Sequence, residues 1–273
     1  MTRLRSPLTL ISLATLIAGV LAATSGLADA PGHVSPQKSE DAFMKAAEAA
    51  AKNGDVNSAI AFYRKAAELA PKDPAPMAEL GDLMDHTGSL GGAVEAYRAA
   101  LARAPNAWRI SLELGRLALK LDRPQDAVAR FETAASQHPE AAAYNGLGVS
   151  LDLTGQHARA QTAYQQGLKL SPIDMTLRNN LGLSQALAGD YPAAIATLSA
   201  LAAEPQAAPR YRLNLALAYG LSGDDDKAAQ AAHEDLGQDQ IASNRRYYQV
   251  LRSLGDRARS EAILGGKSPE VVH

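Results

Sequence analysis

The chain has 273 residues, a formal net charge of −2 and no cysteine, and 47% of its residues are hydrophobic. Without cysteine, disulfide bridges, metal sites with thiolate ligands and a thiol nucleophile are excluded, and the near-neutral charge leaves no electrostatic footprint for nucleic acid. Alanine makes up about a fifth of the residues and aromatic residues only 5%, which favours closely packed helices over a β-sandwich. The composition therefore favours an all-α protein.

The first residues have the pattern of an export signal. Arg3 and Arg5 precede an apolar run over 8–23, and small residues follow it. This order predicts a secretory signal peptide over 1–28, cleaved after Ala28, and therefore export to the periplasm. Cleavage after Ala22 or Ala23 stays open. So does an uncleaved anchor in the inner membrane, although the apolar run is shorter than the roughly 20 residues of a spanning helix.

Three sets of residues recur every 33 or 34 positions in one register. They are the prolines Pro71, Pro105, Pro139 and Pro172, the alanines Ala59, Ala93, Ala127, Ala160 and Ala194, and the glycines Gly81, Gly115, Gly148 and Gly182. A period of this length indicates a repeat protein. Each proline lies near the end of its unit, where it stops a helix because it has no backbone N–H to donate.

Each unit is predicted to be a helical hairpin. The first helix carries Leu-Gly near its middle, and the second carries the repeated alanine followed four positions later by an aromatic residue. The turn residues between them are Gly54, Gly88, Asp122, Gly155, Gly189 and Gly223, and the aromatic residues are Tyr63, Tyr97, Phe131 and Tyr164. We expect the small residues to let helices approach closely, the aromatic rings to fill the wedge between neighbouring hairpins, and the hairpins to stack into a solenoid.

This pattern of Leu-Gly, Ala, aromatic and Pro resembles the tetratricopeptide repeat (TPR), and the resemblance implies an α-solenoid of five to six hairpins. The expected units are 40–73, 74–107, 108–140, 141–174, 175–208 with Leu198 in the aromatic slot, and a degenerate 209–236. A linker is expected over 29–39, capping helices over 237–264 that cover the exposed end of the solenoid, and a disordered tail over 265–273.

Enzyme motifs are weak in this sequence. Gly266-Lys267-Ser268 resembles the end of a phosphate loop, but Glu261 stands where the partner glycine belongs and too few residues follow to form a helix. The six histidines show no metal-ligand spacing. We therefore expect no catalytic residues, no cofactor, no metal and no small-molecule substrate.

In a tetratricopeptide array the first helices line a concave groove that binds a protein or peptide. The candidate residues for this groove are Glu79, Asp82, Arg109, Arg116, Asn145, Asp152, Asn179, Asn180, Arg210 and Asn214. Asn180 and Asn214 stand 34 residues apart, at the same position of consecutive repeats. Asparagine is a poor helix former, and its amide both donates and accepts, so we expect it to contact an extended peptide backbone. The alternative is that these residues only solvate the groove or cap turns.

The C-terminal half carries a more specific series of blocks. In order they are Tyr144–Asp152, Arg178–Ser184 with Ala186–Gly189 close behind, Leu213–Leu221, and Asn244 with Tyr247-Tyr248. Over 140–252 these blocks resemble the TadD family, TPR proteins of tight adherence (Flp, type IVb) pilus systems.

This resemblance implies a non-enzymatic assembly factor at the envelope that helps the outer-membrane secretin to assemble or localise. Some members of the family are lipoproteins, but this chain lacks the cysteine for lipid attachment, so a periplasmic scaffold without a lipid anchor fits better. Two alternatives stay open: a generic periplasmic TPR adaptor for cell-wall or outer-membrane assembly, and an enzyme or accessory domain acting on peptidoglycan.

Overall fold

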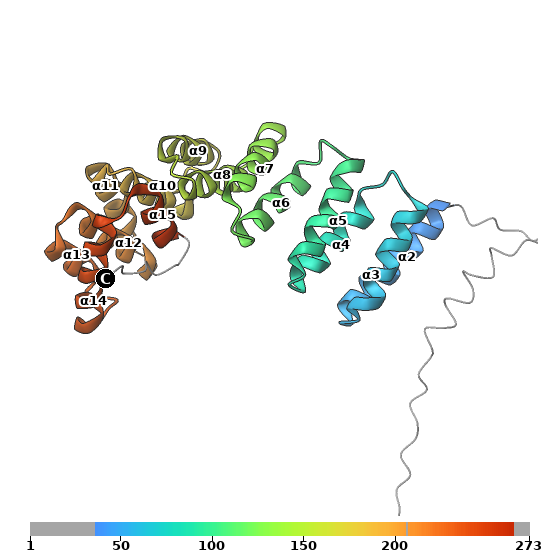
Figure 1. Ribbon diagram of the computed structural model, residues 1–273, viewed down its shortest axis with the longest axis horizontal. Helices are drawn as coiled ribbons and strands as arrows, with labels where there is room; N and C mark the ends of the chain where they lie inside the picture. Colours follow the sequence, from blue (N-terminus) through green and yellow to red (C-terminus); the bar gives the residue numbers. More distant parts are fainter. Residues whose placement is uncertain (1–35, 206, 265–273) are drawn as a thin grey trace, which may run out of the picture. The chain divides into compact units, whose positions relative to one another are not determined.

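The computed structural model describes residues 36–205 and 207–264. Over these residues the protein has fourteen helices, α2 to α15, and no strand (Figure 1). The prediction of an all-α helical repeat is thereby confirmed. The expected signal peptide, most of the expected linker and the expected tail lie outside the described residues.

The chain divides into two compact units, residues 1–104 and 105–273. In the first unit the helices are α2 (Pro36–Lys52), α3 (Val56–Leu69), α4 (Ala75–His86) and α5 (Leu90–Arg103), and each packs against the next. Helix α2 begins at Pro36, inside the segment expected to be a linker. Proline suits the first position of a helix because its φ is already helical and its missing N–H has no partner there.

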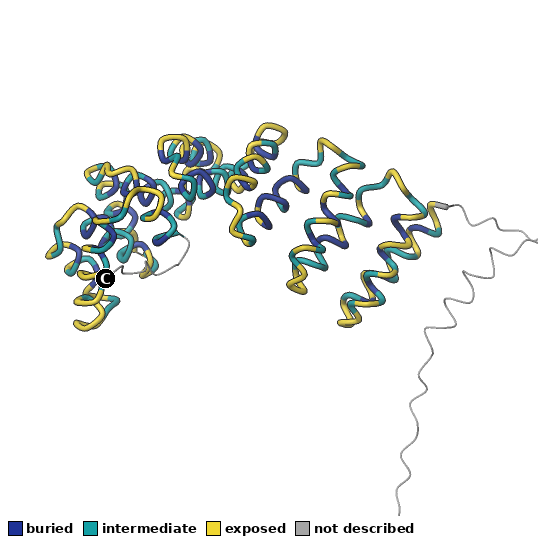
Figure 2. Tube along the Cα trace, in the orientation of Figure 1, coloured by how far each residue is buried: buried dark blue, intermediate teal, exposed yellow. Residues whose placement is uncertain are grey.

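The second unit continues the hairpin series. Its helices are α6 (Trp108–Lys120), α7 (Pro124–Gln137), α8 (Ala141–Leu153), α9 (His157–Leu170), α10 (Met175–Leu187), α11 (Tyr191–Ala202), α12 (Pro209–Ser222), α13 (Asp225–Ala232), α14 (Gln238–Ser253) and α15 (Asp256–Leu264). The helices α6, α8, α10 and α12 are the first helices of their hairpins. Buried and exposed residues alternate along them, with exposed residues gathered at the turns (Figure 2).

The turns inside the hairpins follow the predicted residues. Five of the six turn residues are glycines with φ between 75° and 92°, and the sixth, Asp122, has φ 56°. The residue after each turn glycine donates its backbone N–H back to the first helix, as Asp55 does to the carbonyl of Ala50 at 2.9 Å. This bond closes the helix end in a Schellman motif. In three hairpins the same residue is an aspartate that accepts from the next helix, which fixes both helices of the hairpin.

The Leu-Gly and aromatic slots of a hairpin meet in space. A Cβ atom added to Gly81 would lie 2.7 Å from the ring of Tyr97, and one added to Gly115 would lie 2.9 Å from Phe131. The Phe131 ring also lies against Gly146 of the following hairpin. The aromatic side chain therefore fills a wedge that only a glycine backbone leaves open, as the sequence predicts.

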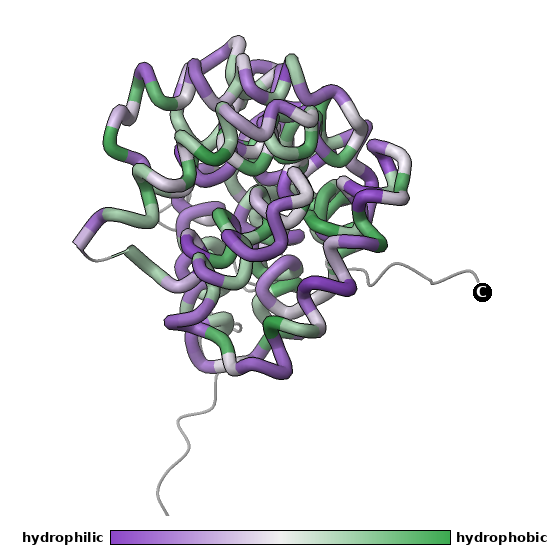
Figure 3. The backbone as a smooth tube through the Cα atoms, turned by 90° about the vertical axis from the view of Figure 1, so that its left-hand side faces the viewer, coloured by the Kyte–Doolittle hydropathy of each residue, from purple (hydrophilic) through white to green (hydrophobic). Residues whose placement is uncertain are grey.

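The first helices of the second unit form one continuous inner face. Helices α6 and α8, α8 and α10, and α10 and α12 pack against one another, whereas the main contacts of the second helices are with their neighbours in the chain. First helices that touch across hairpins lie on the crowded, inner side of a curved stack. Hydrophilic and hydrophobic residues alternate along these helices (Figure 3), and none of the helices in the described part of the chain is long and apolar enough to cross a membrane.

Candidate partner-binding face

Four asparagines form a hydrogen-bonded row across three first helices of the second unit. We call this row, Asn214–Asn179–Asn180–Asn145, the amide chain. Nδ2 of Asn214 donates to Oδ1 of Asn179 at 2.6 Å, and Nδ2 of Asn179 donates to Oδ1 of Asn180 at 3.2 Å. Nδ2 of Asn180 then donates to Oδ1 of Asn145 at 2.8 Å. The amide chain thereby joins α12, α10 and α8.

The hydrogen-bonding capacity left over in the amide chain favours one kind of ligand. Each amide nitrogen carries two protons, and each of the three bonds uses only one of them. Three of the four carbonyl oxygens accept within the chain. The half-buried Asn145, Asn180 and Asn214 thus keep mainly N–H donors, which match the carbonyl oxygens of an extended backbone. Asn179 is 7% exposed and serves as the internal link.

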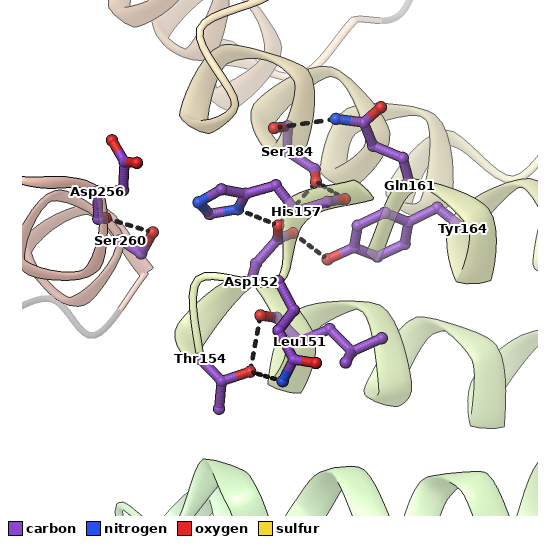
Figure 4. A network of polar contacts seen from close by, with 10 residues as sticks. Leu151, Asp152, Thr154, His157, Gln161, Tyr164, Ser184, Asp256 and Ser260 are labelled. Carbon is purple, nitrogen blue, oxygen red and sulfur yellow. Dashed lines mark hydrogen bonds and ion pairs between the residues drawn. The ribbon is translucent and has the colours of Figure 1, made fainter. Parts of the chain in front are cut away.

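Asp152 does not lie on the groove surface, which corrects the position expected for it. Its side chain is 1% exposed at the end of α8, where it accepts three hydrogen bonds (Figure 4). Oδ1 accepts from Nδ1 of His157 at 2.8 Å and from Oγ of Ser184 at 2.7 Å, and Oδ2 accepts from the hydroxyl of Tyr164 at 3.0 Å. A buried carboxylate needs such donors to repay its lost hydration. Asp152 therefore joins α8, α9 and α10 from inside.

The groups around Asp152 are not arranged for nucleophilic catalysis. In a nucleophilic triad the imidazole lies between the hydroxyl and the carboxylate, so that it takes the hydroxyl proton. Here the carboxylate lies between His157 and Ser184, and Ser184 is fully buried. Burial and the nearby Asp152 carboxylate raise the pKa of Tyr164 well above its ordinary value, which keeps the phenol a hydrogen-bond donor.

The predicted acidic residues of the first unit lie in a different setting. Glu79 is exposed on α4, and Asp82, one turn later, is half-buried and accepts a hydrogen bond from the hydroxyl of Tyr97. Partial burial, then the charges of Asp82 and Glu48, raise the pKa of Glu79. These carboxylates thus form a negative surface rather than a linked network.

The predicted arginines lie at the surface of the second unit. The guanidinium of Arg109 lies 5.1 Å from the ring centroid of Trp108, and Arg116 pairs with Glu113 on its own helix at 2.5 Å. Arg210 lies 4.8 Å from the ring centroid of Tyr211 and donates to its hydroxyl at 2.7 Å. All three are exposed, so they remain available to a partner, but they do not join the amide chain.

Sequence reasoning missed the partners of Asp152. His157, Tyr164 and Ser184 were visible only as a turn-proximal histidine, a wedge aromatic and a helix serine. A usable signal did exist: the aspartate at the end of the fourth first helix and the serine of the next lie 32 residues apart, close to one repeat. Such polar residues on neighbouring first helices are candidates for a bond between repeats.

Comparison with known families identifies the repeats. Models described as tetratricopeptide repeat match residues 38–73, 112–160 and 154–209. These segments span α2–α3 and the hairpins from α6 to α11, the part of the chain where the Gly and aromatic slots are most regular. The chain is therefore built from tetratricopeptide repeats.

Two curated proteins are similar over part of their length. The BBSome complex member BBS4 of Bos taurus is 25% identical over 208 residues, which cover 75% of this chain and 40% of BBS4. The uncharacterized protein y4yS of Sinorhizobium fredii is 28% identical over 109 residues, which cover 40% of this chain and 50% of y4yS. This chain thus spans half or less of each relative.

Solved structures share the fold at low sequence identity. A tetratricopeptide repeat protein from Parabacteroides merdae aligns over 85% of this chain and 94% of its own, with a TM-score of 0.67 and 16% identity. PilF of Pseudomonas aeruginosa aligns over 80% of this chain and 98% of its own, with a TM-score of 0.58 and 18% identity. At these identities the likeness speaks for the fold alone.

Proposed function

We propose that this tetratricopeptide-repeat protein is a non-enzymatic interaction scaffold of the bacterial envelope that assists the assembly of a tight adherence pilus. The observation that carries the proposal is the amide chain, which lies on the inner face of α8, α10 and α12. These helices fall inside segment 140–252, the part of the sequence that resembles the TadD family. A binding face and a specific resemblance thus coincide in the same repeats.

The mode of binding follows from the hydrogen-bonding capacity of that face. Asn145, Asn180 and Asn214 offer N–H donors along three helices, and main-chain carbonyls are acceptors present in every extended peptide. Backbone contacts hold such a peptide, and exposed side chains such as Arg210 select its sequence. The proposed partner is the secretin or another pilus assembly component.

The proposed location is the periplasm, after cleavage of the signal peptide predicted over 1–28. An uncleaved anchor in the inner membrane would expose the same repeats to the same compartment. A scaffold without a lipid anchor suits the absence of cysteine. Recovery of the tagged protein only from the cytosol would contradict the export step.

Photo-crosslinking in the producing bacterium tests the partner. Benzoylphenylalanine is placed at Arg210, on the first helix α12, and at the exposed Gln165 of the second helix α9 as the matched control. We expect an adduct with the secretin or another pilus component from position 210 and none from position 165. Adducts with cell-wall or outer-membrane assembly factors would replace the pilus role with that of a general periplasmic adaptor. Equal adducts from both positions would contradict the binding face.

A further inference from the structure

The last helix, α15, does not lie where a terminal cap belongs. Helix α14 caps the solenoid: it packs on α12 and α13, with the ring of Tyr248 against Gly220 and Leu251 fully buried. Helix α15 instead packs against α8 and α10, the first helices of two earlier hairpins (Figure 1). It therefore reaches back over the inner face of the repeats.

The contacts of α15 divide into two kinds. Its polar ties run to α14: Nε of Arg259 donates to the carbonyl of Leu251 at 3.1 Å, and Nη2 donates to the carbonyl of Leu254 at 2.8 Å. In the described part of the chain no hydrogen bond or ion pair joins α15 to α8 or α10. Its buried residues are the small Ser260 and Ala262, and Ala262 shares a buried cluster with Ala186 of α10.

A helix held in this way is easily displaced. A nine-residue helix is marginal on its own, and small side chains bury little apolar surface. Gly255, exposed and with open space around its α-carbon, separates α15 from α14. The helix has therefore a natural hinge at its start and weak contacts along the face it covers.

The surface under α15 carries an unused polar atom. Nε2 of His157 is buried and has no hydrogen-bond partner among the described residues, while Nδ1 of the same ring donates to Asp152. In Figure 4 the imidazole points toward Ser260 and Asp256 of α15. A buried acceptor without a partner is costly, and α15 offers it no donor at hydrogen-bond distance. The resident helix is thus an imperfect occupant of this surface.

We propose that the inner face of α8 and α10 is a helix-binding surface that α15 occupies in cis. A partner binds there as a short helix with small side chains on its contact face, after α15 swings away at Gly255. The inference rests on the proposed scaffold function and adds to it the form of the partner. The amide chain holds an extended segment, and the adjoining ends of α8 and α10, near Asp152 and Ser184, hold a helix.

Thiol protection in the full chain tests the displacement, because the natural sequence has no cysteine. Ser260→Cys places a single thiol under α15, Ser253→Cys places one at the exposed end of α14, and Ser111→Cys places one in the core of α6. We expect the thiol at 260 to react with dithionitrobenzoate about 10-fold more slowly than at 253 and about 100-fold faster than at 111, because α15 opens without global unfolding. A rate equal to either control would overturn the proposal.

A peptide of residues 254–264, labelled with fluorescein, tests the surface itself. Ala262→Glu in the full chain places a charge at a buried position of α15 and releases the helix, whereas Ala258→Glu makes the same change at an exposed position. We expect the A262E protein to bind the peptide at least about 10-fold more tightly than the A258E and unsubstituted proteins, with unchanged helical circular dichroism.

Equal affinity of the three proteins, or no binding to A262E, would overturn the proposal. Loss of helical signal in A262E would show that α15 is part of the global fold, which also overturns it. These outcomes do not depend on a pilus component. A negative crosslinking result with positive thiol and peptide results would therefore count against the proposed pilus role alone.

Discussion

The two units use a tyrosine and an aspartate from the same hairpin in opposite ways. Tyr97 and Tyr164 occupy the same repeat slot, and each donates its hydroxyl to an aspartate of its own first helix. In the first unit the acceptor, Asp82, is half-buried beside Glu79 and faces solvent. In the second unit the acceptor, Asp152, is buried and also binds two further donors.

The difference teaches what decides the role of a carboxylate on a first helix. Ser184 of α10 supplies Asp152 with a donor from the next hairpin, and His157 supplies another from the turn. Once donors surround the carboxylate, burial becomes affordable and the group stabilises the stack. Asp82 has carboxylates for neighbours, so it stays at the surface and contributes charge instead. We expect the second unit to be held partly by polar bonds between repeats.

The largest expected effect is the loss of the Asp152 carboxylate. Asp152→Ala leaves three buried donors without an acceptor, so we expect the free energy of unfolding to fall by about 3 to 5 kcal/mol. The matched change Asp82→Ala removes a half-buried acceptor and a repulsion on Glu79, and we expect a loss of about 1 kcal/mol or less. Urea unfolding followed by circular dichroism measures both, and equal losses would remove the distinction between the units.

Glycine-to-alanine changes show what the two units share. A Cβ atom at Gly148 would overlap the ring of Tyr164, and one at Gly81 would lie 2.7 Å from Tyr97. We expect each alanine to lower the free energy of unfolding by about 1 to 3 kcal/mol, since a packed ring must move. Gly91 is the control, because open space surrounds its α-carbon and alanine there favours the helix by up to about 1 kcal/mol. A neutral Gly148→Ala in the same urea experiment would contradict the wedge packing.

The amide chain is expected to stabilise the second unit less than Asp152 does. Asn179→Ala removes the internal link and leaves the amide of Asn214 without its acceptor, at an expected cost of about 1 to 2 kcal/mol. Asn145→Ala removes only an end acceptor, and we expect it to cost less. A larger loss from the end position than from the internal one in urea unfolding would show that the amides do not act as a chain.

The smallest effect is confined to high pH. Burial, then nearby carboxylates, raise the pKa of Tyr63 in the first unit to about 12, and burial first of all raises the pKa of Tyr248 in the second unit to about 12. A folded pKa above the ordinary value of 10 means that the stabilisation is complete below pH 10 and is lost as the pH rises from 10 to 12. Ultraviolet titration of tyrosinate should lose its two latest components in Tyr63→Phe and Tyr248→Phe. Titration of both near pH 10 would contradict their burial.

The sequence predicted those parts of the fold that depend on backbone and packing within one repeat. A turn needs a residue that tolerates positive φ, and a wedge needs glycine opposite a ring, so Gly54, Asp122 and the Gly81–Tyr97 pair could be placed from spacing alone. Helix α2 began earlier than expected because Pro36 can open a helix as well as belong to a linker. The predicted bounds of the signal peptide stay a prediction.

The candidate site was predictable only in part, because its bonds run between repeats. Asn180 and Asn214 were singled out by their spacing, but spacing could not show that Asn179 links them through its own amide. Asp152 was expected on the groove, since its burial depends on donors from α9 and α10. The path of α15 could not be read at all: nine residues without a repeat period do not indicate which face they cover.

The central claim is that the inner face of α8, α10 and α12 binds a pilus assembly component through its asparagines. The most direct measurement is the Kd of the full exported chain for the purified periplasmic part of the secretin from the same organism, compared with the Asn180→Ala, Asn214→Ala double variant. We predict a loss of about 10-fold or more in affinity while the double variant keeps its helical signal. An unchanged Kd in a folded double variant would contradict the claim.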